Sequence, residues 1–146
     1  MLKVGDTAPA WTGLDQHGKS RSSQEFSGRW LLLYFYPKDD TPGCTIEACG
    51  FRDDESKFAG RLPVVGVSAD SVDSHRKFAE KYGLTFTLIA DTDKKLIAAY
   101  GKDGLIFPKR VTFLIDPAGV IRKIYHGFDC TTHSADVQKD MDLLGV

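Results

Sequence analysis

Apolar residues gather in short blocks along the chain, and the longest block predicts a central strand. Residues 30–36 (WLLLYFY) contain no charged side chain, which is typical of a strand covered on both faces. Pro37 ends this block because proline has no backbone N–H to donate to a neighbouring strand. Shorter apolar blocks predict further strands at residues 63–68, 87–90, 110–115 and 120–125.

Between these blocks, apolar residues recur every three or four positions, a spacing that predicts helices. Residues 44–59 are expected to be helical, with Cys44, Ala48, Phe51 and Phe58 on one stripe. Three more helices are expected: residues 71–82 before Gly83, a helix capped by Asp91 that ends at Gly101, and a last helix that presents Val137, Met141 and Leu144.

Near the N-terminus, the turn sequence at residues 16–19 (QHGK) predicts a hairpin, and residues 22–26 predict a short helical turn. After it, the predicted order is strand, helix, strand, helix, strand, helix, strand, strand, helix. That order indicates an α/β fold with a mixed central sheet flanked by helices on both faces. No repeat or linker interrupts the sequence, so we expect a single domain over residues 1–146.

Charge and cysteine content exclude several classes of partner. Nineteen basic and twenty acidic residues leave a net charge of −1, which provides no field to attract nucleic acid or an anionic membrane. No apolar block approaches the roughly 20 residues that cross a bilayer, and the start of the chain lacks the apolar core of a signal peptide. Three cysteines do not indicate a secreted disulfide framework, so a cytoplasmic location is expected.

The segment that carries chemistry is residues 36–49 (YPKDDTPGCTIEAC). Cys44 stands where a loop becomes a helix, and the backbone N–H groups and macrodipole at a helix N-terminus favour a thiolate. Pro42 and Gly43 permit a tight turn before it, and the Thr41 hydroxyl is able to hydrogen-bond a thiolate and an incoming oxygen. This pattern predicts nucleophilic attack by sulfur.

A second cysteine, Cys49, lies five residues beyond Cys44. In an intact helix this spacing separates the two Cα atoms by roughly 8–9 Å, which follows from about 1.5 Å of rise and 100° of rotation per residue. A disulfide generally needs Cα atoms closer than about 7 Å, so a Cys44–Cys49 bond requires the first turns of the helix to unwind. Oxidation to a sulfenic acid, local unfolding and condensation with Cys49 form a consistent sequence of steps.

Three other interpretations of the cysteines remain open. Both side chains could be small buried apolar groups, as cysteines without disulfides usually are. Cys44, Cys49, His126 and Cys130 could form a metal site, although structural zinc sites normally use closer pairs of ligands. A general disulfide oxidoreductase normally carries C-x-x-C, which is absent from this sequence.

The same residues resemble a known family. Pro37, Thr41 and Cys44 match the peroxiredoxin signature P-x-x-x-T-x-x-C, and residues 36–53 are similar to the peroxiredoxin Q branch, also called bacterioferritin comigratory protein. The resemblance continues at residues 4–9, 65–68, 88–91 and 110–116, and so covers nearly the whole chain. It implies a thioredoxin-like fold with an added N-terminal hairpin.

Site roles follow from this resemblance, residue by residue. Cys44 corresponds to the peroxidatic cysteine, Thr41 to its hydrogen-bonding partner and Pro37 to a shield of the pocket. Arg110, just before an apolar strand, corresponds to the cation that favours the thiolate and orients the peroxide. Cys49 corresponds to the resolving cysteine of the branch.

The implied activity is a thiol peroxidase that reduces hydrogen peroxide and organic hydroperoxides. The resemblance implies an intramolecular Cys44–Cys49 disulfide that is reduced by thioredoxin or a glutaredoxin-like dithiol protein. It also implies a monomer that needs neither a metal nor an organic cofactor.

Several other residues have no counterpart among these site roles. Glu47 either orients Arg110 or is a solvated helix residue, and both interpretations are kept. Cys130 lies outside the motif and is interpreted as a bystander, with mixed disulfide formation as the alternative. His17, His75 and His133 are expected at the surface. Phe35, Tyr36 and Phe107 are expected either at the mouth of the pocket or in the core.

Overall fold

The computed structural model describes residues 2–58, 60–101, 110–126 and 129–146. Seven strands form one sheet in the order β2-β1-β5-β4-β3-β6-β7. The central strands β3, β4 and β5 are parallel, and the remaining neighbours are antiparallel, so the sheet is mixed as predicted. The strands are β1 (Thr12–Leu14), β2 (Ser20–Ser22), β3 (Leu31–Phe35), β4 (Val64–Ser68), β5 (Thr87–Ala90), β6 (Val111–Ile115) and β7 (Ile121–His126).

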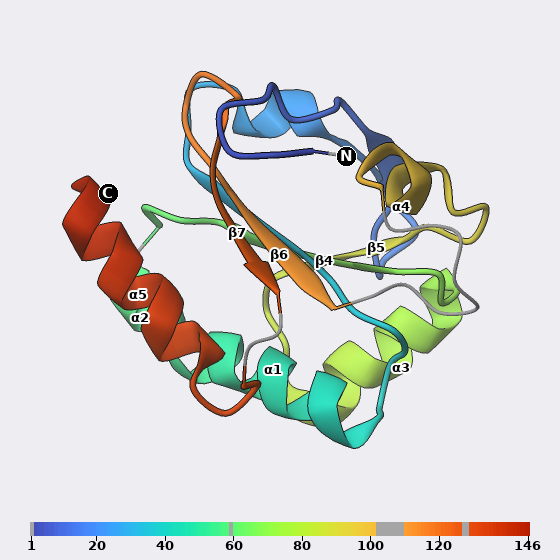
Figure 1. Cartoon of the computed structure of the whole chain (residues 1–146). Coiled ribbons are helices and arrows are strands. Elements are labelled where there is room, and N and C mark those ends of the chain that lie inside the picture. Colours follow the sequence, from blue (N-terminus) through green and yellow to red (C-terminus); the bar gives the residue numbers. More distant parts are fainter. Residues whose placement is uncertain (1, 59, 102–109, 127–128) are drawn as a thin grey trace.

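Helices cover both faces of this sheet (Figure 1). One face packs against α1, α2, α3 and α5, and the other packs against α4 and the short 3-10 helix η1. Successive side chains of β3 alternate between the two cores, since Leu32 and Tyr34 belong to the first and Leu33 and Phe35 to the second. The helices are η1 (Ser23–Phe26), α1 (Pro42–Asp53), α2 (Glu55–Phe58), α3 (Val72–Tyr82), α4 (Lys95–Ala99) and α5 (His133–Leu144).

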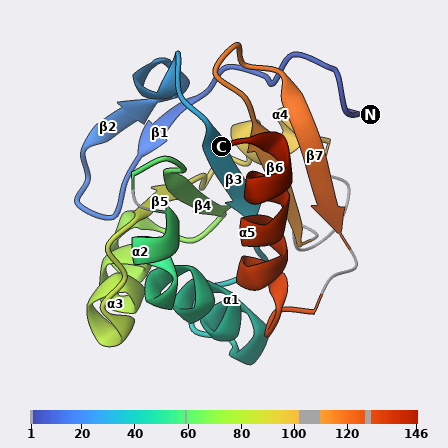
Figure 2. The same cartoon turned by 90° about the vertical axis from the view of Figure 1, so that its left-hand side faces the viewer.

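The predicted helix over residues 44–59 has the wrong limits. It begins at Pro42, because proline suits the first turn, where a backbone N–H has no helical partner. It ends at Asp53, and the separate helix α2 follows. Asp54 marks the break, and its carboxylate accepts a hydrogen bond from Ser134 Oγ of α5 at 2.8 Å. The tertiary contact to α5 therefore coincides with the break, and α5 lies beside α1 (Figure 2).

Helix ends elsewhere follow local sequence signals. Ser71 caps α3 by accepting a hydrogen bond from the Ser74 amide at 3.1 Å, and Gly83 ends it in the left-handed conformation with φ of 63°. The Asp91 carboxylate accepts hydrogen bonds from the amides of Leu96 and Ile97 at 3.1 and 2.8 Å. Asp91 thus bonds the first turn of α4, but the N-cap position is Lys94, and the helix ends at Ala99 and not at Gly101 as predicted. No helix in the described ranges is both long and apolar enough to cross a membrane.

The N-terminal hairpin β1–β2 is confirmed and forms one edge of the sheet (Figure 2). Strand β1 meets β5 through the single register pair Leu14 and Ala90. The buried Gln16 side chain extends this contact, because its Nε2 donates to the Phe86 carbonyl at 2.9 Å and its Oε1 accepts from the Leu88 amide at 3.0 Å. A side-chain amide therefore continues the pairing beyond the end of β1.

Candidate active site

Cys44 is the third residue of α1, and only 1% of it is exposed. Arg110 Nη2 donates a hydrogen bond to Cys44 Sγ at 3.3 Å. The sheet explains this meeting, because β6 runs antiparallel to β3 with Val111 opposite Phe35. Arg110 precedes β6, so it reaches the end of β3, from which the loop to α1 departs. A cation and a helix N-terminus both favour a negatively charged sulfur at this point.

Glu47 lies on the same inward face of α1 and holds the arginine from its other side. Arg110 Nη1 donates to Glu47 Oε1 at 2.6 Å, and Glu47 is 1% exposed. Glu47 therefore contacts Arg110 and is not a solvated helix residue, the other interpretation of the sequence. Burial raises the pKa of Glu47 to about 7, while the Arg110 guanidinium acts to lower it.

The pKa of Arg110 itself lies above its ordinary value. Burial lowers this pKa, but the negative charges of Glu47 and Cys44 and their hydrogen bonds raise it by more. The guanidinium therefore stays charged between its two partners.

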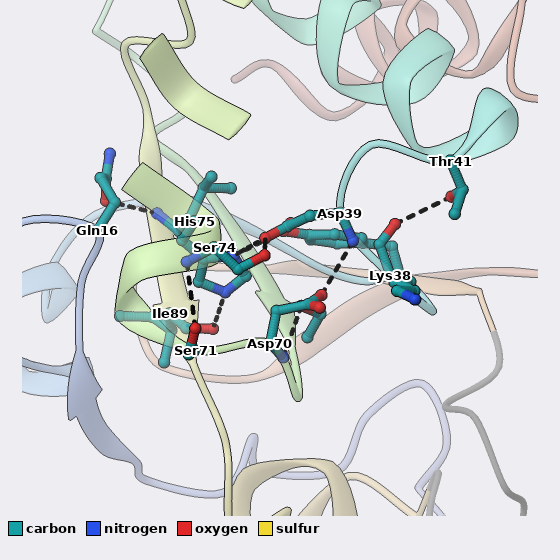
Figure 3. Close-up of polar contacts among 12 residues, drawn as sticks. Gln16, Lys38, Asp39, Thr41, Asp70, Ser71, Ser74, His75 and Ile89 are labelled. Atoms are coloured by element: carbon teal, nitrogen blue, oxygen red, sulfur yellow. Dashed lines mark hydrogen bonds and ion pairs between the residues drawn. The ribbon is translucent and has the colours of Figure 1, made fainter. Parts of the chain in front are cut away.

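Thr41 and Pro37 lie in the loop before α1. The Thr41 hydroxyl donates to the Lys38 carbonyl at 2.9 Å and closes this loop (Figure 3). The Thr41 hydroxyl hydrogen is therefore directed to Lys38 and not, as the sequence predicts, to Cys44. Pro37 follows β3 and is half-buried, and its role as a shield of the pocket stays a prediction.

Cys49 lies on the same continuous helix as Cys44 and is partly exposed. Both residues are thiols in this structure, as is Cys130, and no disulfide joins them. The Cα separation of roughly 8–9 Å that follows from a five-residue spacing in an intact helix therefore applies to Cys44 and Cys49.

Cys130 lies at the site, which its sequence position did not indicate. A Cβ atom on Gly43 would stand 4.0 Å from Cys130 Sγ and 3.0 Å from Arg110 Nη2. Burial raises the pKa of the Cys130 thiol; the Arg110 guanidinium acts to lower it, and Glu47 and Cys44 act to raise it. The raised pKa favours the thiol form of Cys130 over the nucleophilic thiolate.

Two of the three histidines expected at the surface are buried, so that prediction was wrong; His17 is exposed as predicted. His133 packs edge-on against Phe51, and its Nε2 lies 2.8 Å from Thr112 Oγ1. Burial lowers the pKa of His133 to about 4, and the Arg110 charge adds to this shift. His75 is fully buried and contacts the loop before α1.

The spacing of these histidines held a signal that sequence reasoning missed. His75 is three residues before Phe78, and His133 is four residues before Val137, so each shares the buried face of its helix. The aromatic residues considered for the pocket mouth, Phe35 and Tyr36, are core residues. Phe107 lies outside the described residues.

Comparison with known proteins identifies the family. The model of the AhpC/TSA family matches residues 4–124. A Coxiella burnetii protein named as a peroxiredoxin bcp is 43% identical over 145 residues, covering 93% of this chain and 96% of that protein. Among solved structures, peroxidoxin BcpB from Mycobacterium tuberculosis is 35% identical with a TM-score of 0.91, and the match covers 98% of each chain.

A further solved structure concerns alkyl peroxide reduction by the bacterioferritin comigratory protein of Xanthomonas campestris. It is 30% identical with a TM-score of 0.87, and the match covers 93% of this chain and 92% of that one. These neighbours confirm the thioredoxin-like fold with its mixed sheet. The chain belongs to the AhpC/TSA family, within its peroxiredoxin Q or bacterioferritin comigratory protein branch, and is a thiol peroxidase.

Proposed function

We propose that Cys44 is the sulfur that reduces the hydroperoxide. The thiolate attacks the terminal peroxide oxygen, so that an S–O bond forms while the O–O bond breaks. Cys44 becomes a sulfenic acid, and the leaving oxygen takes a proton to become an alcohol or water. The observation that carries this proposal is the hydrogen bond from Arg110 to Cys44 Sγ at the start of α1.

Arg110 supports the same step in a second way. Its guanidinium presents several N–H donors, of which one is directed to Cys44 and one to Glu47. Negative charge moves from sulfur to the leaving oxygen during the attack, and a cation fixed beside the sulfur stabilises that charge without reorganising. Hydrogen peroxide and organic hydroperoxides share the O–O bond, and we propose both as substrates.

Cys49 is proposed as the thiol that resolves the sulfenic acid. Condensation of the Cys49 thiol with the Cys44 sulfenic acid forms a disulfide and releases water. We propose that the unwinding is confined to the first turns of α1, where Cys44 and Glu47 must release Arg110, because the far end of the helix is held to two other helices. Arg52 donates to the Tyr82 carbonyl on α3, and Asp54 just beyond accepts from Ser134 on α5.

The disulfide needs an external reductant. A dithiol protein such as thioredoxin or a glutaredoxin-like protein would attack it by thiol–disulfide exchange and restore both thiols. We propose a monomer that acts in the cytoplasm; the relative from Coxiella burnetii is consistent with that compartment.

Replacing Cys44 with serine tests the proposal. A hydroxyl ionises far above neutral pH and is a poor nucleophile toward peroxide, so Cys44→Ser should lose peroxidase turnover in an assay coupled to thioredoxin and its reductase. Cys130→Ser is the matched control and should keep it. Residual turnover of more than a few per cent in Cys44→Ser would show that another residue reacts with the peroxide.

A further inference from the structure

Asp39 is a buried residue of the loop before α1, and three side chains contact its carboxyl group (Figure 3). Oδ1 accepts from Tyr36 Oη at 2.6 Å. Oδ2 accepts from Ser74 Oγ at 2.8 Å and lies 2.6 Å from His75 Nδ1. Burial raises the pKa of Tyr36 well above its ordinary value, so the phenol keeps its proton and donates it.

The His75 ring lies between two acceptors. Nδ1 faces the Asp39 carboxylate, and Nε2 lies 3.0 Å from the Ile89 carbonyl oxygen. A carbonyl oxygen can only accept, so Nε2 carries the hydrogen of that contact, and Nδ1 shares a hydrogen with the Asp39 carboxyl group. The buried His75 ring therefore bridges Asp39 in the loop and Ile89 in β5.

The loop has further anchors. The Asp39 amide donates to Asp70 Oδ2 at 2.9 Å, and the same oxygen accepts from Ser68 Oγ at 2.6 Å. The neighbouring Asp40, which adopts a left-handed φ of 56°, accepts from Lys81 Nζ and Tyr82 Oη on α3 at 2.8 and 2.6 Å. The buried Asp39 pair is shielded from solvent, whereas the Asp40 pair is exposed and screened.

A metal ion is the alternative occupant. Among the described residues, one ligand atom each from Asp39, Asp70 and His75 lie within 4.8 Å of one another. However, each of these groups already has a hydrogen-bond partner within the cluster or on the backbone. A metal ion would have to displace the His75 proton that faces Asp39.

We propose that the buried Asp39–His75 pair is a positioning device that fixes the loop before Cys44 to α3 while the first turns of α1 unwind and refold. The loop leaves β3 at Tyr36 and enters α1 at Thr41, so its position sets where Cys44 returns after reduction. The pair would keep the loop before α1 in place while the first turns of α1 unfold and refold. The inference rests on the proposed role of Cys44.

Nitrogen-15 NMR of the wild-type protein in both redox states tests the contact without any substitution. The hydrogen shared by His75 and Asp39 should be protected from exchange with solvent in the reduced and in the oxidised protein. In the oxidised protein, amide exchange should become fast at residues 42–50 while the Asp39 amide stays protected. Fast exchange at the His75 ring or the Asp39 amide in the oxidised protein, or a stoichiometric metal ion in the protein as purified, would overturn the inference.

The functional arm compares Asp39→Asn with Asp40→Asn. Asp39→Asn keeps the shape of the side chain but replaces one carboxyl oxygen with an amide NH2, so one of the two contacted oxygens is lost. The rate constant of Cys44 with peroxide should then fall by about tenfold through misplacement of the loop. Asp40→Asn should stay within about a factor of two, as expected for an exposed pair. The double variant Asp39→Asn, His75→Gln should be no slower than the slower single variant, since both changes remove one interaction.

Equal rates for Asp39→Asn and Asp40→Asn would contradict a positioning role. The Asp39→Asn test can fail without the proposed function failing, because Cys44→Ser would remain inactive even if Asp39→Asn reacted normally. If Asp39→Asn does not fold, the NMR and exchange measurements on the wild-type protein still decide the question.

Discussion

Arg110 and Cys44 are 66 positions apart in the sequence, yet a guanidinium N–H reaches the sulfur at 3.3 Å. The pairing of β6 with β3 creates this contact, and Glu47 fixes the second arm of the guanidinium. The cation at the site is therefore held by the sheet and by the helix that carries the thiol.

Replacing Arg110 with alanine should lower kcat/KM for peroxide by about 10²-fold, by analogy with the loss of an oxyanion donor. The rate of alkylation of Cys44 by iodoacetamide at neutral pH should also fall, because the hydrogen bond from Arg110 to the sulfur is lost. Arg76→Ala, at an exposed arginine of α3, is the control and should leave both quantities unchanged. An unchanged kcat/KM in Arg110→Ala would rule out this arginine as the active-site cation.

Cys49→Ser should react once with peroxide, because Cys44, Arg110 and Glu47 remain in place. Turnover with thioredoxin should fall sharply, and excess peroxide should drive Cys44 to sulfinic or sulfonic acid, which mass spectrometry detects. The wild-type protein should instead lose about two mass units as one internal disulfide forms. A disulfide from Cys44 to Cys130 in the wild-type protein would contradict the proposed resolving role.

The oxidised wild-type protein should contain less helix than the reduced protein. Cys44 and Cys49 share the continuous helix α1, and a disulfide cannot span their separation there. We expect a loss of about one to two turns, measured by far-ultraviolet circular dichroism and by hydrogen exchange at residues 44–50. Identical exchange in both redox states would show that the bond forms without unwinding.

Burial of Glu47 predicts a pH dependence of stability. Its pKa is about 7 in the folded protein against 4.5 as the ordinary value, so the folded state binds more protons between these pH values. The free energy of unfolding due to Glu47 should therefore fall as pH rises from about 4.5 to 7, by as much as about 3 kcal/mol.

His133 opposes this trend, because its pKa is lowered from 6.5 to about 4 and its contribution rises with pH between those values. The quantity to measure is thus the difference in unfolding free energy between the wild-type protein and Glu47→Gln, by urea denaturation at several pH values. A difference that does not change between pH 5 and 7.5 would mean that Glu47 is ionised throughout in the folded protein.

Gly66→Ala should destabilise the protein. Gly66 lies in β4, and an added Cβ would come within 2.9 Å of the Tyr34 ring and of Leu88 Cδ2. Overpacking of this kind costs about 1–3 kcal/mol, and Tm should fall by roughly 3–10 °C. The control is Gly50→Ala in α1, where the added Cβ meets only Ser134 Cβ at 3.7 Å. Equal Tm values for the two variants would indicate that the Tyr34 ring moves aside at little cost.

Sequence patterns predicted the order of elements and the mixed sheet, because apolar blocks and capping residues act locally. The block at residues 30–36 gave β3 within one residue at each end, and Gly83 ended α3 as expected. The break of α1 at Asp54 was not predictable from local signals, since the contact found there comes from Ser134, 80 positions away.

The site was predictable where one segment supplies it and less so where distant segments meet. The motif around Cys44 is local, and resemblance supplied Arg110, whose contact with Cys44 depends on strand pairing. His75 contacts Asp39, 36 positions earlier, whereas a surface position was expected because no set of metal ligands lies near it in the sequence. Cys130 likewise reaches the site through the fold and not through any motif.

The Gln16 side chain has a consequence for how firmly the N-terminal hairpin is attached. Without its amide, the Phe86 carbonyl and the Leu88 amide would be left without these partners where β1 ends. Phe86 and Leu88 are buried, and a buried backbone group without a partner costs about 1–3 kcal/mol. A single glutamine side chain thus does for the hairpin what a further residue pair between β1 and β5 would otherwise have to do.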